Sequence, residues 1–126
     1  MSAYRAALPL LRSAAREHRG ALVINTASIS AKVPEPGVSI YAATKAAVVG
    51  FTHAMNKELG PEGIKSCALL PGLVATPMTE HLHGEVPAEQ MIRPADVAEV
   101  VRSLVRLGPT CVVAELEFQR PGGLAW

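Results

Sequence analysis

The feature that most constrains the fold is the alternation, along the chain, of segments with helical periodicity and short apolar runs. Apolar residues recur at helical spacing in three segments, residues 3–18, 40–59 and 94–107. Each is followed by an apolar run of strand length, at residues 21–24, 64–70 and 111–118. The first run has no polar alternation, which is typical of a parallel strand covered on both faces. This order predicts an α/β fold with a parallel sheet of about three strands and helices on both faces.

Three breaks in these patterns carry expectations about element boundaries. Pro9 lies inside the first helical pattern and lacks an N–H, so it predicts a kink there or a helix that begins near it. Ser39 stands where the N-terminal cap of the second helix is expected. The polar residues 76–93 predict a loop, with or without a turn of helix, whose sizeable apolar side chains are Leu82, Val86 and Met91.

Composition excludes several kinds of partner. The 126 residues fit one domain, and 49% hydrophobic with 18% charged residues supports a packed core. A formal net charge of +1 leaves no basic surplus for nucleic acid. The apolar runs fall well short of the roughly 20 residues that cross a bilayer, so we expect no membrane association and place the chain in the cytoplasm. Cys67 and Cys111 lie far apart and are expected to be buried free thiols.

Ser28, Tyr41 and Lys45 form the most informative candidate site. Tyr41 and Lys45 are four residues apart on an expected helix, so the ammonium lies one turn from the phenol. A nearby positive charge favours the phenolate, which makes the tyrosine a usable acid or base near neutral pH. Ser28 follows the first strand, and open α/β sheets build their sites at such strand ends. Taken alone, the four-residue spacing of Tyr41 and Lys45 is also consistent with an ordinary pair of surface side chains.

Other candidates for chemistry are weaker. His81 and His83 have no nearby cysteine and only scattered carboxylates, so we expect solvated loop residues and no metal. Ser28 lacks the Gly-x-Ser-x-Gly elbow of serine hydrolases. Cys67, inside a strand, has no visible activating partner.

The sequence around the candidate site resembles the short-chain dehydrogenase/reductase family. The similar stretches are LVINTAS at 22–28, YAATKAAVVGF at 41–51, LGPEGI at 59–64 and LPGLVATPM at 70–78. Ser28 and Tyr41 are 13 positions apart, the common separation in that family. RPADVA at 93–98 is similar to the start of a later helix of the family. The resemblance covers residues 3–120, approximately.

The resemblance implies a role for each matching residue. Tyr41 would exchange a proton with a carbonyl or hydroxyl oxygen of a small-molecule substrate, while NAD or NADP exchanges hydride with the adjacent carbon. Lys45 would lower the pKa of the tyrosine and bind the nicotinamide ribose. Ser28 would orient the substrate oxygen.

The segment after the second strand is the other implied part of the cofactor site. Pro71 and Gly72 would form the turn where backbone approaches the nicotinamide. Val74 would offer backbone groups to the carboxamide, and Thr76 its hydroxyl. Taken without the resemblance, Pro71 and Gly72 are also consistent with an ordinary turn at the end of a strand.

The sequence departs from the family pattern in its first part. No Gly-x-x-x-Gly-x-Gly between a strand and a helix occurs, so the turn that seats a pyrophosphate is missing. The family's fourth catalytic residue is an asparagine on the helix before the serine strand. No asparagine occurs in residues 1–20, so this residue is expected to fall upstream of residue 1. At the other end, QRPGG at 119–123 replaces the more frequent Asp-Gly-Gly tail. The resemblance therefore implies a partial Rossmann-like, doubly wound sheet, with residues 1–126 as one partial domain that lacks an N-terminal half.

Two functions remain open from the sequence. The first is an NAD(P)-dependent oxidoreductase that interconverts an alcohol and a carbonyl, with a substrate that is small or bound in an open site. The alternative is a truncated, catalytically silent remnant or interaction module. Under either function, the 126-residue chain alone is expected to be inactive and to bind dinucleotide weakly or not at all. We also expect a homo-oligomer, because the strand at 21–24 offers an apolar edge and the tyrosine helix carries small residues at Ala46, Ala47, Gly50 and Ala54.

Overall fold

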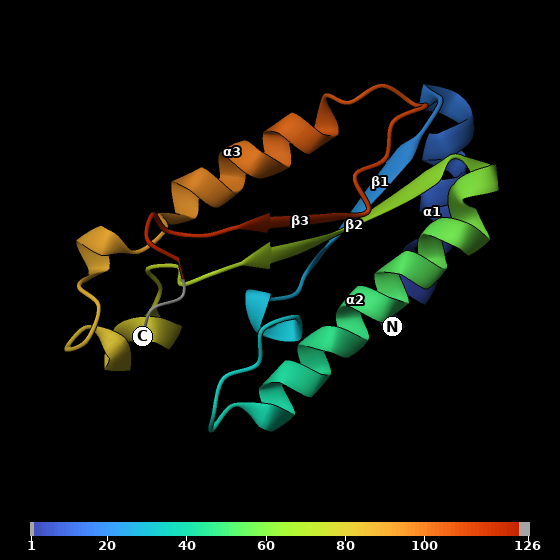
Figure 1. Ribbon diagram of the computed structural model, residues 1–126. Helices are drawn as coiled ribbons and strands as arrows, with labels where there is room; N and C mark the ends of the chain where they lie inside the picture. Colours follow the sequence, from blue (N-terminus) through green and yellow to red (C-terminus); the bar gives the residue numbers. More distant parts are fainter. Residues whose placement is uncertain (1, 124–126) are drawn as a thin grey trace.

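The computed structural model describes residues 2–123 and has the expected alternation of helices and strands (Figure 1). The main elements are α1 Ser2–His18, β1 Ala21–Thr26, α2 Ser39–Leu59, β2 Ile64–Pro71, α3 Pro94–Val105 and β3 Glu115–Phe118. Four short 3₁₀ turns connect them: η1 Ile29–Ala31, η2 Gly60–Glu62, η3 Pro77–Leu82 and η4 Ala88–Gln90. The ends of the expected domain, residues 1 and 124–126, lie outside the described residues.

The three strands form one parallel sheet in the order β1-β2-β3. Ala21 lies opposite Ile64 at one end of the β1–β2 pair, and Thr26 lies opposite Leu69 near the other. Pro71 lies opposite Phe118 at the end of the β2–β3 pair. The carboxyl ends of all three strands therefore meet at one edge of the sheet, which confirms the predicted α/β fold.

Helices cover both faces of the sheet. The aromatic ring of Tyr4 on α1 packs edge-on against Phe51 of α2, with ring centroids 5.5 Å apart, in a core that includes Ile64 of β2. On the opposite face, Leu104 of α3 packs against Cys67 and other side chains of β2. Burial of apolar side chains on both faces is the main term that holds such a layered fold together.

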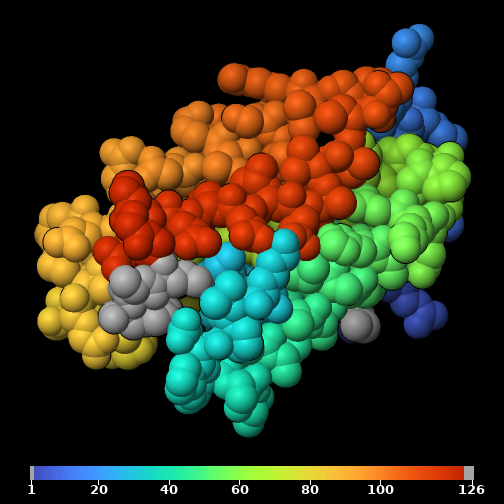
Figure 2. Space-filling model, in the orientation of Figure 1, coloured from blue at the N-terminus to red at the C-terminus, as the bar shows by residue number. Residues whose placement is uncertain are grey.

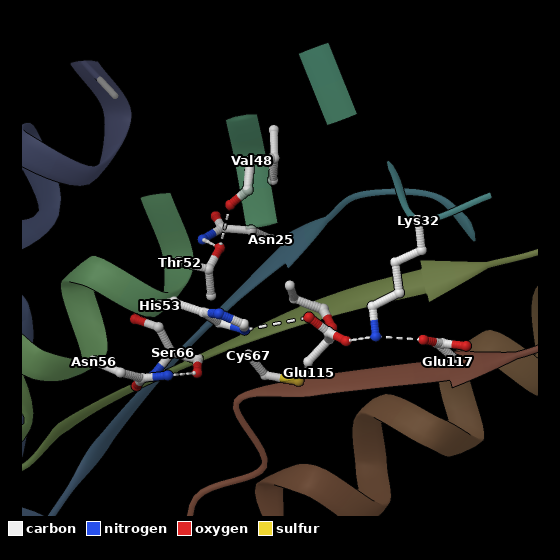
Figure 3. A network of polar contacts seen from close by, with 11 residues as sticks. Asn25, Lys32, Val48, Thr52, His53, Asn56, Ser66, Cys67, Glu115 and Glu117 are labelled. Carbon is white, nitrogen blue, oxygen red and sulfur yellow. Dashed lines mark hydrogen bonds and ion pairs between the residues drawn. The ribbon is translucent and has the colours of Figure 1, made fainter. Parts of the chain in front are cut away.

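The side chain of Asn56 joins α2 to β2 through two hydrogen bonds to the strand backbone. Its side-chain nitrogen donates to the Ser66 carbonyl at 2.5 Å, and its side-chain oxygen accepts from the Ser66 N–H at 2.6 Å (Figure 3). The Ser66 hydroxyl lies 2.8 Å from the phenol oxygen of Tyr4. Both helices on this face are thus tied to the same strand position, where unsatisfied buried polar groups would be costly.

Both helix starts differ in detail from the sequence predictions. The helix α1 runs through Pro9 with a full turn before it, so the expected start near Pro9 is wrong. Pro9 lies on the exposed side of the helix, where water can satisfy the carbonyl that proline leaves unpaired. The expected cap at Ser39 is also wrong, because Val38 occupies that position and makes no side-chain hydrogen bond.

The third strand is shorter than predicted. It begins at Glu115, and residues 111–114 form a loop instead. The ammonium of Lys65 donates to the carbonyls of Gly108 at 2.9 Å and Cys111 at 3.1 Å. These bonds hold the preceding chain in a turn and leave Cys111 exposed, so the prediction that both cysteines are buried is correct for Cys67 and wrong for Cys111.

Two further features bear on assembly. Within residues 2–123, β1 has β2 as its only strand neighbour. Ala46, Ala47 and Gly50 of α2 are exposed, and Ala54 is partly exposed. The expected homo-oligomer stays a prediction. No helix among the described residues is long and apolar enough to span a membrane.

Candidate active site

The carboxyl ends of β1 and β2 bring the predicted site segments to one edge of the sheet. The Ala27 N–H donates to the Leu69 carbonyl at 2.7 Å, so the chain leaves β1 alongside the last residues of β2. Ser28 is the second residue after β1, and Gly72 is the first after β2. Open parallel sheets bind ligands at this edge because the connecting loops diverge there.

Ser28 caps the turn η1. Its hydroxyl oxygen accepts the Ser30 N–H at 3.2 Å, and the residue is 8% exposed. A serine hydroxyl that accepts one hydrogen bond keeps its own proton as a donor. The structure therefore fixes the oxygen of Ser28 and leaves it able to donate to an acceptor at the strand end.

Tyr41 and Lys45 lie one helical turn apart near the start of α2. The Lys45 ammonium is 5.6 Å from the centroid of the Tyr41 ring and donates to the Thr26 carbonyl at 3.1 Å. That bond ties the tyrosine helix to the end of β1, two residues before Ser28. An ammonium carries three donors, so the bond to Thr26 leaves Lys45 with others to offer. Tyr41 itself is 39% exposed.

The segment after β2 is held on both sides by backbone hydrogen bonds. The Gly72 N–H donates to the Phe118 carbonyl at 2.9 Å. Val74 forms a parallel bridge with Ile92, and its carbonyl accepts the hydroxyl of Thr79 at 2.8 Å. Thr76 has extended backbone and begins the turn η3. A Cβ at Gly72 would lie 3.5 Å from the Gln119 Cα, an ordinary contact, so nothing within the chain itself requires glycine there.

The sizeable apolar side chains of the predicted loop at 76–93 are packed inward to different degrees. Val86 and Met91 are 4% and 5% exposed, so they pack the loop after β2 instead of lining open space, and Leu82 is partly buried. Met78, the last residue of the LPGLVATPM stretch, is 75% exposed on η3.

A groove elsewhere on the molecule contains none of the predicted site residues. It has a volume of about 630 Å³, lies between α1, β1 and α2, and is lined mainly by apolar side chains that include Tyr4, Val23 and Phe51. Among residues 2–123, no group of three or more His, Cys, Asp and Glu is placed to hold a metal ion. The candidate site is therefore the strand-end edge.

The two thiols differ sharply in their surroundings. Cys67 is fully buried, and burial together with the charge of Glu115 raises the pKa of its thiol to about 11. Since the thiolate is the reactive form, we expect Cys67 to be inert near neutral pH and Cys111 to react. A disulfide reagent should titrate one thiol quickly in the native protein and two in denaturant. Cys111→Ser should abolish the fast phase, whereas two fast thiols in the native chain would contradict this.

A polar cluster beside the sheet carries no sequence motif and was not predicted. Lys32, His53, Glu115 and Glu117 come from the loop after β1, from α2 and from β3, and Figure 3 shows them in a row of contacts. Their separation along the chain explains why no local pattern reveals them.

The sequence matches the family described as short chain dehydrogenase over residues 1–86. A 3-oxoacyl-[acyl-carrier-protein] reductase from Synechocystis is 34% identical over 107 residues, which are 81% of this chain and 43% of the relative. The human (3R)-3-hydroxyacyl-CoA dehydrogenase is 41% identical over 90 residues, 65% of this chain and 34% of the relative. The chain thus spans less than half the length of these two relatives.

Solved structures give the same picture. A 3-oxoacyl-[acyl-carrier protein] reductase from Brucella melitensis superposes with a TM-score of 0.76 and 35% identity, covering 93% of this chain and 46% of that one. A 3-ketoacyl-(acyl-carrier-protein) reductase from the same species, complexed with NADH, gives 0.79 and 27% identity, covering 92% and 50%. The match over residues 1–86, the level of identity and the shared fold lead to one conclusion: this chain belongs to the short-chain dehydrogenase family.

Proposed function

We propose that this chain carries the catalytic and nicotinamide-binding side of an oxidoreductase that interconverts an alcohol and a carbonyl. The single observation that carries the proposal is the link from Tyr41 through Lys45 to the end of β1. The Lys45 ammonium lies 5.6 Å from the Tyr41 ring centroid and 3.1 Å from the Thr26 carbonyl. A proton-transfer group, a positive charge beside it and a strand end for substrate are thereby brought together.

Each residue has a defined task in this proposal. Tyr41 gives a proton to the substrate oxygen during reduction and removes it during oxidation. Lys45 places its positive charge beside the Tyr41 ring and uses its remaining donors on ribose hydroxyls. Ser28 donates its hydroxyl proton to the same substrate oxygen, which polarises the carbonyl.

The residues present fit one half of a nicotinamide dinucleotide. Lys45 reaches the end of β1, and the held backbone from Gly72 to Val74 and Thr76 follow the end of β2. These groups supply hydrogen-bond partners suited to a nicotinamide ribose and carboxamide. When bound, the dinucleotide supplies or accepts a hydride. The sequence printed here has no glycine-rich strand-to-helix turn for the pyrophosphate, so the proposal is confined to the nicotinamide side, and the choice between NAD and NADP is left open.

Dividing the dinucleotide into its two halves tests the proposal. Nicotinamide mononucleotide, titrated into the uniformly ¹⁵N-labelled chain, should shift the amide resonances of Lys45, Gly72, Val74 and Thr76. ADP-ribose, which carries the adenine and pyrophosphate, is the matched control and should leave those resonances unmoved. The alternative, a silent remnant or interaction module, predicts no shift at these four amides with either compound up to the solubility limit.

A further inference from the structure

Glu115 contacts two side chains that come from the two segments carrying Ser28 and Tyr41. One carboxylate oxygen forms an ion pair with the Lys32 ammonium, and the other lies 3.3 Å from the ring nitrogen Nε2 of His53 (Figure 3). Lys32 also reaches Glu117 at 2.5 Å. The Glu115 side chain is 18% exposed, less than any other member of the cluster. It is therefore the enclosed node of these contacts.

The first contact leads to the serine turn. Lys32 is the C-terminal cap of η1, and Ser28 is the N-terminal cap of the same turn. The Lys32 N–H donates to the Ile29 carbonyl at 2.9 Å, which closes this short turn. A displacement of Lys32 would therefore move Ser28, which lies four residues earlier in the same turn. Figure 2 shows the chain of β3 crossing the surface directly beside the loop that follows η1.

The second contact leads to the tyrosine helix. His53 lies on α2, two turns after Lys45 and on the part of the helix that packs over β2. Its Nε2 is buried and, within residues 2–123, has no hydrogen-bond partner, and a carboxylate oxygen of Glu115 lies 3.3 Å from it. Glu115 thus faces the helix that carries Tyr41.

The third connection is made by the backbone of β3. Glu115 lies opposite Ala68 of β2, and Phe118 lies opposite Pro71. The Phe118 carbonyl also accepts the Gly72 N–H. Movement of β3 along β2 would therefore displace the segment that follows β2.

Charge explains why the cluster needs Lys32. Glu115 and Glu117 are two residues apart on one strand, so their carboxylates lie on the same face and repel each other. The hydrogen bonds that the Lys32 ammonium donates to the carboxylates of Glu115 and then Glu117 raise the pKa of Lys32 above its ordinary value. The lysine is charged at neutral pH, and the stabilisation it provides is lost only as the pH rises through that raised pKa.

We propose that Glu115 is a positioning residue of the candidate active site. Its ion pair with Lys32 holds the serine turn, and its contact with His53 sets it against the tyrosine helix, both beside the strand pair that leads to Gly72. This inference rests on the proposed function for its catalytic meaning, but the three connections themselves are testable in the chain without cofactor.

The experiment compares Glu115→Gln with Glu117→Gln in the ¹⁵N-labelled chain. Both variants remove one negative charge and keep the size of the side chain. Glu115→Gln should shift the native amide resonances of Ser28, Ser30, Lys45 and Gly72, and Glu115→Asp should restore most of each shift. Glu117→Gln should move only resonances near residues 32 and 117. A residue that only stabilises the fold would lower the urea midpoint and leave the native-state resonances of Ser28 and Ser30 in place.

A double-mutant cycle closes the test. Lys32→Gln should shift Ser28 and Ser30 as Glu115→Gln does, and the double variant should add nothing at those two amides because both changes break one connection. If Glu115→Gln does not fold, Lys32→Gln alone decides the question. Unmoved Ser28 and Ser30 resonances, or the same pattern from Glu117→Gln, would overturn the inference. Neither result depends on nicotinamide binding, so it is distinguishable from failure of the proposed function.

Discussion

Tyr41→Phe should lower NAD(P)-dependent turnover of an alcohol or ketone by about 10²–10⁴, the usual contribution of a general acid or base. The variant loses the phenol proton but keeps the aromatic ring at the start of α2. Turnover is to be measured in a form of the protein that binds the dinucleotide. Binding of nicotinamide mononucleotide by the chain should change little, since the proposal assigns cofactor contacts mainly to Lys45 and the segment after β2.

Tyr4→Phe is the matched control for this substitution. Tyr4 is the other tyrosine of the chain, and its phenol oxygen lies 2.8 Å from the Ser66 hydroxyl in the core. Removing the Tyr4 hydroxyl should lower the free energy of unfolding by about 0.5–1.5 kcal/mol, the net value of one hydrogen bond, and leave turnover nearly intact. Near-normal turnover in Tyr41→Phe, or an equal loss in Tyr4→Phe, would remove Tyr41 from its proposed role.

Lys45→Met should lower turnover and shift one limb of the pH–rate profile. The substitution removes the charge 5.6 Å from the Tyr41 ring and the hydrogen bond to the Thr26 carbonyl. The first loss removes the positive charge beside the proposed acid or base, and the second loosens the helix from the end of β1. Binding of nicotinamide mononucleotide should weaken as well, because the donors proposed for the ribose are gone.

Lys57→Met, on the exposed side of the same helix, controls for the loss of one positive charge. It should leave both the profile and the affinity unchanged. If Lys45→Met weakens cofactor binding but its pH profile coincides with that of the wild type, the electrostatic role of Lys45 is wrong and only its binding role survives.

The fold is largely predictable because its elements are marked by local patterns. Helical periodicity and β-branched runs locate all three helices and all three strands, and a parallel α/β sheet follows from their order. The misjudged boundaries depend on long-range contacts. The third strand begins later than predicted because Lys65, more than 40 residues away, binds the carbonyls of Gly108 and Cys111 in the preceding loop.

The candidate site is predictable to a different extent. Ser28, Tyr41 and Lys45 carry a recognisable spacing, and the structure places Lys45 between Tyr41 and the strand that precedes Ser28. Their chemical roles stay predictions. Glu115 could not be found from the sequence, because its partners are separated from it by tens of residues and no motif joins them. The sheet register and the path of the loop after β1 are needed to bring it near Lys32.

The most direct measurement of the central claim is contact between a nicotinamide ring and Tyr41. The chain has two tyrosines, so selectively labelled ring protons give two sets of signals, which Tyr4→Phe assigns. With nicotinamide mononucleotide present, the proposal predicts nuclear Overhauser effects from the nicotinamide protons to the ring of Tyr41 and none to that of Tyr4, together with amide shifts at Lys45 and Gly72. Bound nicotinamide that shows no such effect at Tyr41, or that shifts residues of the groove between α1 and α2 instead, would contradict the account.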